Sequence, residues 1–321
     1  SKSKVSEVLS RKVPITLSMM RALHKNLGIP AEVLLHSTNT KLQQSLLEVD
    51  WTKFPLLEMT KRGWVERKEN IKKHAEEIMM SLLKDAGGEK ALTAVHCRRG
   101  ISSRYNEKTD DYSITVWRLR VLARARKEKL PKKFNRSLLT ADKMNDLVRL
   151  SVFSQGPVMA KEFLNTLGIH IIIETHLPKT YLDGAAMLLP NGSPVIGLTL
   201  RYDRIDNFWF SLLHELAHVK LHLQRPEDCF LEDLHMKIIP SNDDNPEIEA
   251  DKMATEAVIP EKFWKEKILE KTVTIEQVEN WADELKIHPA LVAGRIRFHT
   301  GDYRKFSKFL GTGAVRRQFL D

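Results

Sequence analysis

The residues of this chain best suited to chemistry form the pattern His-Glu-x-x-His, which begins at His214. His214 and His218 are four residues apart, so on an α-helix of about 3.6 residues per turn both side chains lie on one face. Two imidazole nitrogens could therefore bind one metal ion. Glu215 adjoins this face and could activate a water at the metal without being a ligand. The pattern predicts a zinc (Zn2+) site with Glu215 as the general base.

The flanking residues indicate that this helix is buried. Apolar residues surround the pattern on most of the helix circumference, namely Phe208, Leu212, Leu213, Leu216, Ala217, Val219 and Leu221. Two surface histidines on an ordinary helix are the alternative, but that interpretation needs a polar face. Buried histidines and a buried glutamate need polar partners, and a metal ion provides one. His222 lies one turn further on, and we expect it to pack or to orient a ligand.

Catalytic zinc usually takes three protein ligands, so a third is needed. The best segment runs from Pro246, which suits a first helical turn, to Pro260, which ends the helix. On that helix Glu247 points close to the apolar face and Glu249 points well off it. We predict Glu247 as the third ligand, with Glu249 as the alternative. Asp251, one turn after Glu247, could orient a ligating histidine.

These residues carry a resemblance to a known family. The run from Arg201 to Phe210, the His-Glu-x-x-His pattern and the run from Glu247 to Asp251 resemble the ImmA/IrrE family of metallopeptidase domains. The resemblance covers residues 150–265 and implies a gluzincin-like zinc endopeptidase that hydrolyses a protein. More narrowly, the chain resembles HigA-type regulators, which join a helix-turn-helix to such a domain.

Residues 1–36 resemble the recognition helix and the following helices of a lambda-repressor-type (XRE) domain. The resemblance implies that Lys2, Ser3, Lys4 and Ser6 contact the bases and phosphates of a DNA operator. The two helices that precede a recognition helix are not in this sequence, so we expect a truncated helix-turn-helix. Repressor-type domains commonly dimerise on palindromic sites, and a homodimer is therefore expected.

Composition narrows the class of protein. The chain has 321 residues, of which 42% are hydrophobic and 29% charged, as in a soluble globular protein. A net charge of +9 favours an acidic partner such as nucleic acid, and a solubilising excess of lysine is the alternative. Two cysteines, Cys97 and Cys229, form no disulfide framework, which favours the cytoplasm. No apolar run reaches the roughly 18 residues of a membrane helix, so we expect no membrane partner.

Periodicity along the chain predicts an α+β fold in four parts. These are the partial helix-turn-helix (1–36), a helical linker or dimerisation region (37–150), the metallopeptidase domain (151–265) and a helical C-terminal region (266–321). The linker holds a basic helix over residues 115–133, which could follow phosphates or be a solvated face.

The metallopeptidase part should contain a small sheet. Three β-rich runs, at 169–174, 185–189 and 195–200, predict a short antiparallel sheet packed on the metal-binding helix. In zinc peptidases of this kind a sheet edge holds an extended substrate by backbone pairing. We expect residues 183–186 to lie at the rim of that site.

Two functions from different classes are consistent with these features. The first is a DNA-binding transcriptional regulator, antitoxin-like, whose zinc peptidase domain cleaves itself, a partner toxin or another regulator. The second is a catalytically silent, peptidase-like sensor or toxin-binding module in such a regulator. Glu215 favours the first, because a silent fold has no need for a general base.

Overall fold

The computed structural model describes residues 17–30, 49–88, 91, 108–225, 228–232, 246–268 and 273–319. They fall into two compact units, one up to Lys53 and one from Phe54 onward. In the first unit, helix α2 (Leu17–Leu27) ends at Gly28, which adopts the left-handed conformation common after a helix (φ 65°). The proposed DNA contacts Lys2, Ser3, Lys4 and Ser6 lie outside the described residues, and their role stays a prediction.

The second unit combines many helices with one small sheet, which confirms the predicted α+β class. Its α-helices in chain order are α5 (Leu56–Lys61), α6 (Ala75–Ala86), α8 (Asp111–Lys127), α9 (Ala141–Arg149), α10 (Gly156–Thr166), α11 (Ile205–Leu221), α12 (Pro246–Val258), α13 (Glu261–Lys267), α14 (Ile275–Leu285) and α15 (Pro289–Thr300). The helical tail is therefore present. None of the helices in the described ranges is long and apolar enough to cross a membrane.

The sheet has four strands in the order β1-β3-β2-β4. They are β1 (His170–Ile173), β2 (Gly184–Leu188), β3 (Pro194–Leu198) and β4 (Phe230–Glu232). Strand β2 is antiparallel to β3 and to β4, whereas β1 is parallel to β3. The predicted sheet is thus present but mixed instead of purely antiparallel. The reason is that β1 pairs with β3, and β3 returns from the β2–β3 hairpin in the same direction as β1.

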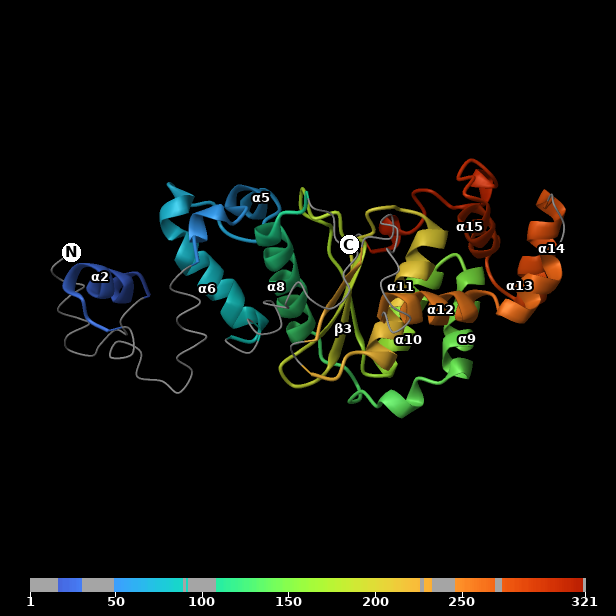
Figure 1. Ribbon diagram of the computed structural model, residues 1–321, viewed down its shortest axis with the longest axis horizontal. Coiled ribbons are helices and arrows are strands. Elements are labelled where there is room, and N and C mark those ends of the chain that lie inside the picture. The colour runs from blue at the N-terminus through green and yellow to red at the C-terminus, as the bar shows by residue number, and fades with distance from the viewer. Residues whose placement is uncertain are drawn as a thin grey trace. The chain divides into compact units, whose positions relative to one another are not determined.

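Two helices cover the two faces of this sheet, α8 on one side and α11 on the other (Figure 1). On the α8 face a Cβ added to Gly197 would lie 2.7 Å from the ring of Trp117. On the other face Ala186 and Ile196 join Leu212 of α11 in the main hydrophobic core. Small residues in the strands therefore let both helices pack closely on the sheet.

The arginines of α8 bind within the protein. Arg124 donates to the carbonyl oxygen of Ile173 (2.6 Å) and to the carboxylate of Glu174 (3.0 Å). Arg126 donates to two carbonyl oxygens at the end of α6 (3.0 and 2.7 Å), and Arg118 is only 2% exposed. These side chains hold α8 against the sheet and α6.

We expect Gly197→Val to destabilise the second unit. The added methyl groups would meet the Trp117 ring, and overpacking of this kind costs about 1–3 kcal/mol. Urea unfolding followed by circular dichroism measures the change, with the exposed Lys129→Ala as the control. An unchanged midpoint in Gly197→Val would show that α8 can move away from the sheet without cost.

Candidate metal centre

Helix α11 places His214 and His218 inside the protein. Each residue is 0% exposed, and their Nε2 atoms lie 3.0 Å apart. The helix is apolar on nearly all sides, and the two histidines occupy the part of its surface that faces α12. The four-residue spacing therefore brings the two ring nitrogens to one point, as the helical repeat requires.

Glu247 joins them from the first turn of α12. Its carboxylate oxygens lie 3.3 Å from His214 Nε2 and 3.7 Å from His218 Nε2, and the residue is 2% exposed. Among the residues that the structure describes, this is the one group of three or more histidine, cysteine or acidic side chains whose ligand atoms all lie within 4.8 Å of one another. The geometry favours Glu247 over Glu249, whose side chain is 55% exposed.

Asp251 orients the ring of His214. Its Oδ1 lies 2.9 Å from His214 Nδ1. An ionised carboxylate only accepts hydrogen bonds, so Nδ1 of His214 carries the proton. In the neutral ring, Nε2 then presents its lone pair to the centre. Carboxylates that anchor metal-binding histidines in this way fix the tautomer and the ring orientation.

A longer chain of hydrogen bonds orients His218. Glu249 Oε2 lies 2.8 Å from His222 Nε2, and His222 Nδ1 lies 2.9 Å from His218 Nδ1. When Glu249 accepts from Nε2–H of His222, Nδ1 of that ring can accept from Nδ1–H of His218. The His218 Nε2 lone pair therefore also points to the centre. Helical spacing within one segment could not reveal that α12 brings Glu249 opposite His222.

The donor set fits a divalent metal ion. Burial lowers the pKa of His218 to about 4, so its ring is neutral at pH 7. Burial raises the pKa of Glu247, but contacts with His214 and His218 outweigh this effect and hold the pKa at about 2. Two imidazole rings and a carboxylate thus face one another in a buried place, which calls for a cation. Two histidines and one glutamate are a known set for catalytic zinc.

Glu215 lies between α11 and the start of β2, and it is 0% exposed. A Cβ added to Gly184 would lie 2.7 Å from Glu215 Oε1 and 3.0 Å from its Cγ. Glycine at this position therefore leaves room for the carboxylate beneath the strand. The sequence placed residues 183–186 at the rim of the site, but it did not show that the glycine accommodates the proposed base.

The aromatic ring of Phe230, in β4, covers one face of the His218 ring. The two rings are stacked, with centroids 4.2 Å apart and an angle of 9° between their planes. Phe230 is itself only 6% exposed. Strand β4 was not predicted from the sequence, because three residues are too few to show a periodic pattern.

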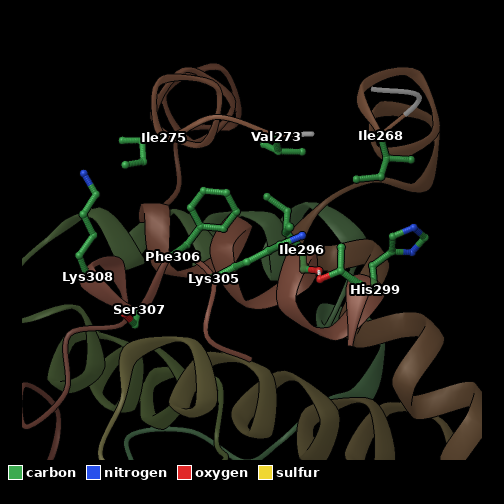
Figure 2. Close-up of a pocket in the computed structure, with 10 residues that line it drawn as sticks. Ile268, Val273, Ile275, Ile296, His299, Lys305, Phe306, Ser307 and Lys308 are labelled. Carbon is green, nitrogen blue, oxygen red and sulfur yellow. Dashed lines mark hydrogen bonds between the residues drawn. The ribbon is translucent and has the colours of Figure 1, made fainter. Parts of the chain in front are cut away.

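A cavity of about 680 Å³ lies elsewhere, in the helical tail. Figure 2 shows apolar side chains from α15 and from the segments around it, with Lys308 at one side and Lys305 among them. Its lining consists of Ile268, Val273, Ile275, Ile296, His299, Thr300, Lys305, Phe306, Ser307 and Lys308. None of the metal-centre residues lines it, so the chemistry proposed from the sequence is not located in this cavity.

One family model matches part of the chain. Residues 165–297 match the family model of the IrrE N-terminal-like domain, and this span contains all five site residues predicted for the metal centre. This segment is metallopeptidase-like. Neither the curated proteins nor the solved structures include a significant match to the chain. The helix-turn-helix resemblance of residues 1–36 is not part of the matched span.

Glu247 and Glu249 of α12 should differ in their effect on zinc affinity. We expect Glu247→Ala to lose zinc binding most, because it removes a ligand. Glu249→Ala and His222→Ala should each weaken binding by about 10–100-fold, because they act through the orientation of His218. Competition with a chromogenic chelator measures the dissociation constants, with exposed Glu256→Ala as the control. A larger loss in Glu249→Ala than in Glu247→Ala would make Glu249 the ligand.

The metal-free protein should lose stability in mild acid. The pKa of His218 is about 4 when folded against an ordinary value of 6.5, so the unfolded chain binds more protons between these pH values. The free energy of unfolding therefore falls as the pH drops from 6.5 towards 4, and the contribution is fully present above 6.5. Urea unfolding of chelator-treated protein at pH 7 and pH 5 tests this. His218→Gln should show a smaller drop, and an equal drop would exclude His218 as the cause.

Proposed function

We propose that residues 165–297 are a zinc-dependent metallo-endopeptidase domain within a DNA-binding regulator. The observation that supports this most directly is the buried group of His214, His218 and Glu247, with a further buried carboxylate, Glu215, next to His214 in the sequence of α11. Three residues suffice to hold a metal ion. A carboxylate next to them that belongs to the His-Glu-x-x-His pattern is what a peptidase needs in addition.

In this proposal each residue of the site has its own role in peptide hydrolysis. His214, His218 and Glu247 would hold zinc, which supplies Lewis-acid activation of water and of the scissile carbonyl. Glu215 takes a proton from the attacking water and passes it to the leaving amine. Asp251 keeps the His214 ring in place, as the His222–Glu249 pair does for His218. The surrounding apolar core excludes other water from these groups.

A silent binding module is the second candidate. It is favoured by the burial of the centre, since His214, Glu215, His218 and Glu247 are each at most 2% exposed and the Phe230 ring covers one ligand. Such a module would sense a signal or bind a toxin through the same fold. Glu215 argues against it, because a purely structural metal site needs no general base.

The regulatory half of the proposal rests on the sequence. Residues 1–36 resemble part of a repressor-type domain, and the net charge of +9 favours a polyanionic partner. We propose an operator DNA as that partner, bound by a homodimer, and a protein substrate that is the chain itself, a toxin or another regulator.

Glu215→Gln should separate metal binding from cleavage. We expect wild-type protein to hold about one zinc ion per chain and to cleave members of a proteome-derived peptide library. Glu215→Gln should keep the zinc and lose cleavage by about 10²–10⁴-fold, because only the proton transfer is removed. Metal analysis and mass spectrometry of the library measure both, and His218→Ala should lose zinc and cleavage together. Retained cleavage in Glu215→Gln would exclude it as the base, whereas zinc binding without any cleavage would favour the silent module.

A further inference from the structure

Strand β4 occupies the sheet edge that would bind a substrate. Strand β2 pairs with β3 on one side and with β4 on the other. The β4 pairing is antiparallel, with Gly184 opposite Glu232, Ala185 opposite Leu231 and Ala186 opposite Phe230. The edge of β2 nearest the metal centre is therefore already filled by a segment of the same chain.

The register of this pairing sets β4 over the reactive groups. Gly184 and Ala186 are two residues apart, so their side-chain directions share one face of β2, and Glu215 lies against Gly184 on that face. Residues directly opposite one another in an antiparallel pair also share a face. Phe230 accordingly lies on the α11 side and stacks on His218. Strand β4 thus contacts His218 of α11 through Phe230, while its neighbour β2 contacts Glu215 through Gly184.

Leu231 lies on the opposite face from Phe230. It is opposite Ala185, which is next to Gly184 in β2 and therefore points away from α11. The two neighbouring residues of β4 are thus inequivalent, since one contacts a proposed zinc ligand and the other does not. Backbone pairing with an exposed strand gives a peptide its affinity, and pockets for alternate side chains give its specificity. Of Phe230 and Leu231, the residue on the metal side is the aromatic one.

We infer that β4 is an internal pseudo-substrate and that the substrate is an extended protein segment with an aromatic residue in the place of Phe230. This inference rests on the proposed peptidase function and adds the substrate class to it. The substrate pairs with β2 in the antiparallel direction that β4 uses, and its aromatic ring stacks on His218. Substrate and β4 exclude one another, because both need the same backbone groups of β2.

An edge strand can also serve only to protect a sheet from unwanted pairing. In that case β4 would stabilise the fold, but no peptide would compete with it. Removal of the Phe230 ring distinguishes the two roles. A protective strand leaves a less stable protein, whereas a pseudo-substrate leaves a protein that binds peptides of matching sequence.

Peptide binding to zinc-loaded protein tests the inference without relying on catalysis. The probe is a fluorescent synthetic peptide with the sequence of residues 225–235 and serine in place of Cys229, and the readout is fluorescence anisotropy. All proteins carry Glu215→Gln, so that the peptide stays intact. Phe230→Ala should bind the probe about tenfold more tightly than protein with Phe230, because loss of one aromatic stack of about 1.4 kcal/mol weakens β4 by that factor. A probe with alanine at the Phe230 position should bind about tenfold more weakly.

Leu231→Ala is the matched control, since it shortens a side chain of the same strand on the other face and should leave probe binding within about twofold. Phe230→Leu, which keeps most of the apolar volume, replaces Phe230→Ala if that variant fails to fold.

Equal binding of the two probes, or no gain in probe binding on removal of the Phe230 ring, would overturn the inference. Selective probe binding without cleavage of any library peptide by wild type would support the inference and reject the peptidase function. Cleavage with no preference for aromatic residues, together with no probe binding, would support the peptidase function and overturn the inference.

Discussion

The burial of two imidazoles and a carboxylate at one point is the constraint on which this structure depends. Each polar group removed from water must find a partner, and the surrounding residues are almost all apolar. Helix α12 provides such partners through three acidic residues that are spaced two positions apart in its first turns. Glu247 enters the centre, Asp251 binds the back of His214, and Glu249 reaches His218 through His222. The close packing of α11 and α12 therefore carries both the core and the chemistry.

The sheet imposes a second requirement, because β2 must lie close to α11 and β3 must lie close to α8. Gly184 admits Glu215 on one face, and Gly197 admits Trp117 of α8 on the other. Trp117 also donates from its ring N–H to the carbonyl oxygen of Glu174, which ties α8 to the end of β1. With both faces covered, the edge of β2 is where another strand can be added, and β4 lies there. The position of β4 next to the metal centre follows from this layered packing.

The burial of the centre bears on both functional hypotheses. A peptidase that acts in regulation needs to be restrained until its substrate arrives, and under the peptidase hypothesis the strand β4, paired with β2, would provide such restraint. A silent module would be buried for stability alone. Glu215 and Gly184 distinguish these interpretations, because a carboxylate that is not needed as a ligand, with a glycine that makes room for it, serves catalysis better than it serves packing.

Helical periodicity made part of the site predictable from the amino-acid sequence. The spacing of His214 and His218 and the direction of Glu247 against Glu249 follow from about 100° per residue, which is a local property. The remaining features depend on the folded chain. The pairing of β1 with β3, the contact of His222 with Glu249 and the stacking of Phe230 on His218 join segments that are distant in sequence. Such contacts arise from how buried surfaces pack, and no repeat within a single segment encodes them.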